Sequence, residues 1–136
     1  MALGNAFPVR SSIPDTFRVL GVWTGGGAAA NMTKATGDWN RGIASVNYNA
    51  ATGKYLITFT DVGQQIVAYN ISCTSTTGVI PKDVALLRAT LSQSAKTVEI
   101  EIRTPATDVA AAALVDLVST FKILIDVTFA KNAPDA

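Results

Sequence analysis

Residues 43–61 read IASVNYNAATGKYLITFTD, and this stretch decides the fold class. Its second half, 54–61, places bulky apolar side chains at every second position, which is typical of a β-strand with one buried face. These alternating residues are Tyr55, Ile57 and Phe59. Residues 43–48 form a partner strand, and residues 49–53 supply the turn, because Gly53 adopts positive φ without a steric penalty. The stretch therefore predicts an antiparallel β-hairpin.

The same period of two recurs on both sides of this hairpin. Segment 121–130 is the most β-prone in the chain, and we expect it at the centre of a sheet, since an exposed edge of this kind invites aggregation. Segment 84–91 fits a strand or a helix by pattern alone, but a strand lets it pair with 96–103 as a second hairpin. The predicted strands run over 16–23, 43–48, 54–61, 67–74, 84–91, 96–103 and 121–130. Joined by Gly, Asn, Thr and Pro turns, they predict an all-β, two-layer antiparallel sandwich or jelly roll.

One segment departs from the strand pattern. Residues 109–118 are rich in alanine and follow Asp108, a residue type that caps helices. Their low charge argues against a free surface helix. We expect a loop or a short helix that packs on the sheet or on a neighbour.

The two ends of the chain differ from the sandwich domain, which is predicted to span 16–131. Residues 1–15 form an extended arm, because Pro8 and Pro14 restrict the residues before them to extended conformations. The arm is either a frayed terminus or a clamp that orders on a neighbour. Its apolar residues favour the clamp and are candidate contacts with a partner or a neighbouring subunit: Leu3, Phe7, Val9 and Ile13. Residues 132–136 form a polar tail.

Composition narrows the classes of function. The chain has no histidine and one cysteine, so it cannot build a Ser-His or Cys-His catalytic pair, an internal disulfide or a Cys/His zinc site. The net charge is +1 and basic residues are scattered, which predicts no nucleic-acid or membrane partner. No apolar run approaches the ~20 residues that cross a bilayer. We expect a soluble, non-enzymatic protein without cofactor or metal, whose apolar surface is covered by other subunits.

Four further features could carry chemistry, and each has a structural alternative. The glycines at 25–27 lack the Lys-Ser/Thr ending of a phosphate-binding loop. Glu99 and Glu101 share one strand face, where a solvated outer face is expected rather than an acid pair. Cys73 falls on an apolar face, where we expect a small buried apolar side chain rather than a reactive thiol. Trp23 and Trp39 flank the glycine-rich loop. They are candidates for a sugar-stacking platform, although tryptophans more commonly serve as core or interface anchors.

The hairpin and its surroundings resemble the capsid decoration, or cement, proteins of tailed bacteriophages. The resemblance lies in residues 42–59, with their Gly53-Lys54-Tyr55 turn exit, and in the order of arm, first strand, glycine-rich loop, hairpin and closing strand after 110–117. It implies a subunit, commonly a homotrimer, that is made in the host cytoplasm and binds the major capsid protein on the outer face of the virion. The alternatives are a trimeric receptor- or glycan-binding head and a tail or baseplate component.

Overall fold

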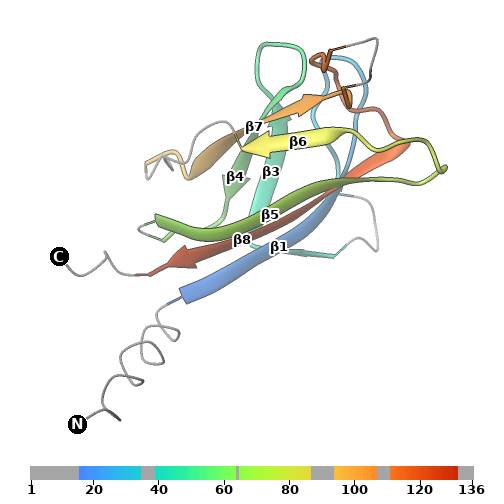
Figure 1. The fold of residues 1–136 in the computed structure, drawn as a ribbon. Coiled ribbons are helices and arrows are strands. Elements are labelled where there is room, and N and C mark those ends of the chain that lie inside the picture. Colours follow the sequence, from blue (N-terminus) through green and yellow to red (C-terminus); the bar gives the residue numbers. More distant parts are fainter. Residues whose placement is uncertain (1–15, 35–38, 64, 87–93, 107–110, 132–136) are drawn as a thin grey trace, which may run out of the picture.

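A computed structural model describes residues 16–34, 39–63, 65–86, 94–106 and 111–131, and it shows two antiparallel sheets packed face to face (Figure 1). The two-layer β-sandwich predicted from the sequence is confirmed. The strands are β1 (Thr16–Thr24), β2 (Asn40–Arg41), β3 (Ile43–Tyr48), β4 (Lys54–Phe59), β5 (Gln65–Ser75), β6 (Asp83–Leu86), β7 (Thr97–Arg103) and β8 (Phe121–Ala130). The predicted arm and tail lie outside the described residues.

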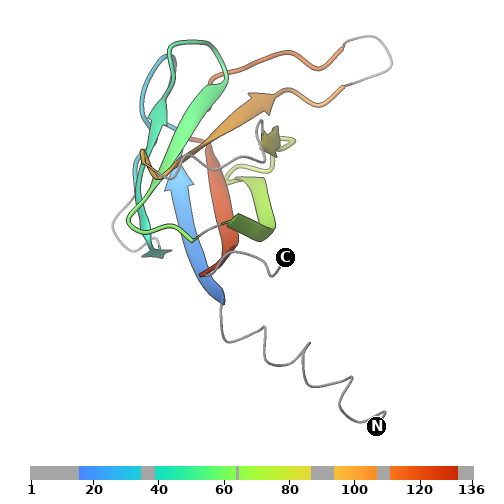
Figure 2. The same ribbon diagram turned by 90° about the vertical axis from the view of Figure 1, so that its left-hand side faces the viewer.

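Among the described residues, each sheet has four strands. Sheet A has the order β2-β1-β8-β5, and sheet B has the order β3-β4-β7-β6. The strand expected at a sheet centre is β8, which pairs along its length with β1 on one side and β5 on the other. Figure 2 shows β1 and β8 side by side within one layer. The predicted hairpins are β3–β4 and β6–β7, although residues 87–91 of the second lie outside the described part.

The core lies between the sheets and follows the predicted alternation. On β8, every second side chain from Phe121 to Phe129 is buried, and on β4 Tyr55, Ile57 and Phe59 are buried. Phe129 joins the layers: its ring stacks on Phe17 of β1 with centroids 5.2 Å apart, and it meets Phe59 of the opposite sheet edge-on at 5.1 Å. These contacts are close to the preferred geometries of aromatic pairs.

Strand β5 departs from the expected alternation at one end. Ile71 and Cys73 pack against the core as predicted, but Val67 and Tyr69 are 48% and 56% exposed. A β-bulge between Ile66 and Ala68 shifts the register against β8. Because a bulge inserts one unpaired residue, Ile66 packs against the core instead of Val67.

The described part of the segment with helical leanings, residues 111–118, is a loop. Residues 111–118 contain one isolated bridge, between Leu114 and Arg103, and no helical turn. The amide of Val115 donates to the carbonyl of Ile102, and the amide of Thr104 donates to the carbonyl of Ala113. Pairing with the end of β7 therefore overrides the helix propensity of the alanines.

Candidate interaction surfaces

The loops at one end of the sandwich are joined by the carboxylate of Asp116. One of its oxygens accepts a hydrogen bond from the Gly53 amide in the β3–β4 turn, at 2.8 Å, and the other accepts from the Ala29 amide, at 2.9 Å. The buried hydroxyl of Tyr55 accepts from the amide of Leu117 at 3.0 Å. The Asp116 carboxylate and the Tyr55 hydroxyl thus hold three chain segments in one arrangement. We call residues 25–31, 49–53, 76–82 and 111–120 the loop end.

Sequence reasoning missed this role of Asp116. The residue lies in a segment whose alanines suggested a helix, and the partners of its carboxylate are backbone amides distant in sequence. The glycine-rich segment is part of the same framework: the amide of Gly25 donates to the carbonyl of Phe121, and that of Gly27 to the carbonyl of Leu117, each at 3.0 Å. Gly25 and Gly26 allow close backbone approach, since a Cβ on either would clash with backbone atoms, whereas Gly27 adopts a φ of +101°.

Three of the exposed large apolar residues lie on two neighbouring loops of the loop end. Val79 and Ile80, on the β5–β6 loop, are 53% and 72% exposed, and Val118 is 45% exposed. The two loops are tied together because the amide and hydroxyl of Thr76 both donate to the carbonyl of Thr120, at 2.9 and 3.0 Å. Residues 76–80 carry no charge. This part of the surface is suited to contact with an apolar partner surface.

The structure separates the two tryptophans that could have formed a platform. Trp23 is 7% exposed and belongs to the core, where it lies in register with Ile123 of β8. Its ring is therefore unavailable as a surface contact in the isolated chain. Trp39 is 55% exposed, and its carbonyl accepts a hydrogen bond from the Val22 amide at the edge of β1. The four predicted contact residues of the arm lie outside the described residues: Leu3, Phe7, Val9 and Ile13.

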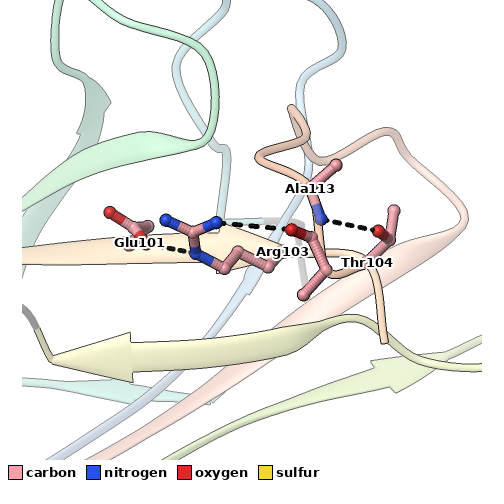
Figure 3. A network of polar contacts seen from close by, with 5 residues as sticks. Glu101, Arg103, Thr104 and Ala113 are labelled. Atoms are coloured by element: carbon pink, nitrogen blue, oxygen red, sulfur yellow. Dashed lines mark hydrogen bonds and ion pairs between the residues drawn. The ribbon is translucent and has the colours of Figure 1, made fainter. Parts of the chain in front are cut away.

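One member of the carboxylate pair on β7, Glu101, is part of a structural network. Glu101 was expected on a solvated face, but it is only 8% exposed, and its carboxylate forms an ion pair with Arg103. Figure 3 shows the Arg103 side chain between Glu101 and the following loop, where it donates to the carbonyl of Ala112. The Thr104 hydroxyl accepts from the Ala113 amide beside it. The network attaches the 111–120 segment to sheet B.

The outer face of sheet A carries an ion pair between neighbouring strands. Arg18 of β1 donates two hydrogen bonds to the carboxylate of Asp126 on β8, at 2.8 and 2.7 Å. These bonds favour the charged form and lower the pKa of Asp126 below its ordinary value. Because the Arg18 side chain is 61% exposed, solvent screens the pair and its contribution to stability is small.

This ion pair predicts a specific pH dependence. A carboxylate whose pKa is lowered by folding stabilises the native state above its unfolded pKa of about 3.9, and this contribution is lost as the pH falls through the folded pKa. We expect Asp126→Asn to flatten the acid limb of the stability curve, measured by urea unfolding between neutral and acidic pH. Arg18→Gln should flatten it as well, since it removes the cause of the shift. An acid limb in Asp126→Asn as steep as that of the wild type would contradict this assignment.

The described residues give no support for a metal site, a membrane-spanning helix or a reactive thiol. They contain no group of three or more His, Cys, Asp or Glu side chains that could hold a metal ion. No helix in that part of the chain is long and apolar enough to span a membrane. Burial raises the pKa of the half-buried Cys73 thiol, which is the direction expected for a packing residue and opposite to that of an activated nucleophile.

Comparison of the chain with protein-family models, with curated proteins and with solved structures found no match.

Proposed function

We propose that the chain is a structural virion protein that binds the outside of a bacteriophage capsid as a homotrimer and stabilises the shell. The observation that supports this proposal is the uncharged, apolar part of the loop end, formed by Val79, Ile80 and Val118. An assembly protein needs such a surface on a defined support. The Asp116 and Tyr55 hydrogen bonds hold the loop of Val118, and the Thr76 hydrogen bonds tie the loop of Val79 and Ile80 to it.

A trimer suits this task for a physical reason. Three equivalent contacts on one local threefold position act together, so that modest single interfaces combine into high avidity. Each contact needs to bury only about 800 Å² per partner to be specific. In this proposal the loop end contacts the shell, while residues 1–15 reach the shell or a neighbouring subunit.

The direct test uses capsid shells purified from particles that lack this protein. The purified protein is mixed with the shells and co-sedimentation is measured. We expect the double variant Ile80→Asp, Val118→Asp to lose at least about tenfold in affinity, because each change places a charge in a desolvated contact. Thr77→Asp is the matched control: it adds a charge to an exposed position of the same loop and should bind more tightly than the double variant.

The arm is tested separately. Deleting residues 1–15 should abolish shell binding while the far-ultraviolet circular dichroism spectrum stays that of a β-protein. Wild-type protein that fails to bind the shells would overturn the proposed function. Unchanged binding after the deletion would overturn the role of the arm alone.

One observation favours a second candidate, a glycan- or receptor-binding head. Trp39 is exposed, and an aromatic face can stack on the apolar face of a sugar ring. In that case Trp39→Ala would abolish glycan binding on an array and leave shell binding intact. A tail or baseplate component is distinguished by copy number in purified particles, since a shell protein is present in hundreds of copies and a tail part in few.

A further inference from the structure

Strand β5 is a long sheet edge that lacks most of the features that prevent another strand from pairing with it. It has 11 residues, whereas β2, at the other edge of sheet A, has two. It pairs with β8 on one side, and no strand among the described residues lies on its other side. A free edge presents unpaired N–H and C=O groups that can pair with another strand.

The sequence of β5 lacks the features that normally block such pairing. QIVAYNISCTS contains no charged residue and no proline. The only protective device is the bulge at Ile66 and Ala68, and beyond it the register from Ala68 to Ser75 is regular. Soluble proteins commonly place lysine, proline or a bulge along an exposed edge. In β5 the one such feature, the bulge, lies at one end of the strand.

The inner face of the same edge is incompletely covered. Tyr69 is in register with Val127, so the two side chains point to the same side of the sheet, yet Val127 is buried and Tyr69 is 56% exposed. A hollow of about 290 Å³ lies beside Tyr69 and is bounded across the sandwich by Leu86 of β6. A strand added to β5 would cover the Tyr69 ring.

We propose that the β5 edge pairs with β5 of a second copy of this chain, antiparallel and about a twofold axis, so that the two A sheets become one. Three observations favour a second copy as the occupant. First, an uncharged strand pairs with itself without opposing like charges, which a twofold axis would otherwise impose. Second, an axis perpendicular to the sheet keeps each inner face on the same side. Third, an axis through Ile71, the middle of Ala68–Thr74, places Tyr69 opposite Cys73 of the other copy and so covers its ring.

This inference does not rest on the proposed function. A twofold contact is also compatible with a trimer, because trimers on neighbouring threefold positions of a shell can meet across twofold axes. In free protein, the contact yields dimers, or assemblies larger than a trimer where a threefold contact forms as well.

Cysteine cross-linking tests the pairing directly. In a Cys73→Ala background, Asn70→Cys and Ser72→Cys place single thiols on the outer face of β5. With the axis through Ile71, position 70 faces position 72 of the other copy, so the two variants should form a disulfide when mixed and oxidised. Self-cross-linking of Asn70→Cys or of Ser72→Cys would also support the pairing and would move the axis to that residue. Asn47→Cys is the matched control, an exposed asparagine on the edge strand of sheet B, and should remain unlinked.

A charge variant gives an independent readout. Asn70→Lys is expected to weaken self-association about tenfold or more, measured by light scattering and native mass spectrometry, because it brings two lysines close together across the axis. The single chain accommodates this lysine, since position 70 lies opposite Asp126 on the outer face. Asn47→Lys should leave association unchanged. The inference is overturned by wild-type protein that remains monomeric or purely trimeric, or by an absence of cross-links in all β5 combinations.

Discussion

Replacing Gly25 with alanine is expected to destabilise the protein by more than about 3 kcal/mol. A Cβ at this position would meet the carbonyl oxygens of Val118 and Leu117, the latter at 2.5 Å, and the carbonyl carbon of Leu117 at 2.6 Å. These are backbone atoms, and the Leu117 amide is itself bound to the Tyr55 hydroxyl. The chain at Leu117 and Val118 cannot move away from a Cβ at position 25 without breaking this hydrogen bond. Urea unfolding monitored by circular dichroism measures the loss.

Gly78→Ala is the matched control for this variant. Gly78 has a φ of +79°, but a Cβ there would meet nothing within 4 Å. Its alanine variant should therefore cost only the conformational strain of a left-handed residue, about 1 kcal/mol. Comparing the two variants separates the cost of a clash with nearby backbone atoms from the cost of a left-handed backbone conformation. Equal costs for the two variants would contradict the close approach at Gly25.

Phe129→Ala is the second large effect we expect, at about 3–5 kcal/mol. The ring is fully buried and contacts the rings of Phe17 and Phe59, which belong to different sheets. Its removal leaves a cavity between the layers that neither sheet can close alone, because both are held by strand pairing. Equilibrium unfolding in urea gives the change in the free energy of unfolding.

The conservative variant shows how much of the lost free energy of unfolding comes from the missing side-chain volume. Phe129→Leu keeps most of the buried volume and should cost less than half as much as Phe129→Ala. If the two substitutions cost the same, the aromatic geometry rather than the filled volume would be responsible for the effect. If both cost less than about 1 kcal/mol, the role of Phe129 as a link between the sheets would be wrong.

The parts of the fold that the sequence predicts correctly are those governed by local periodicity. The hairpin at 43–61 and the central strand at 121–130 were predicted because alternation and turn chemistry are local signals. The pairing of β1 with β8 joins residues 98 to 114 positions apart and leaves no comparable trace in either strand. Topology therefore had to come from the structure.

The surface residues were harder to predict, for specific physical reasons. A bulge is invisible in a hydrophobic pattern, so the pattern assigns Val67 to an apolar face that Ile66 occupies instead, whereas Tyr69 lies on the predicted face but is exposed at the sheet edge. The pattern places Glu101 on the correct side of the strand, but it does not show the ion pair with Arg103 or the hydrogen bond from Arg103 to the loop that follows β7. Trp23 and Trp39 have the same chemistry, and only strand position makes one buried and the other exposed.

The pairing of β1 with β8 has a consequence for how the protein is made. During translation β1 emerges first among the described strands, yet its long partner is synthesised last. The nascent chain can close the β3–β4 hairpin early, but the middle of sheet A waits until residue 130 has left the ribosome. Until then β1 and β5 both lack the strand that separates them, and we expect newly made chains to depend on chaperones during this interval.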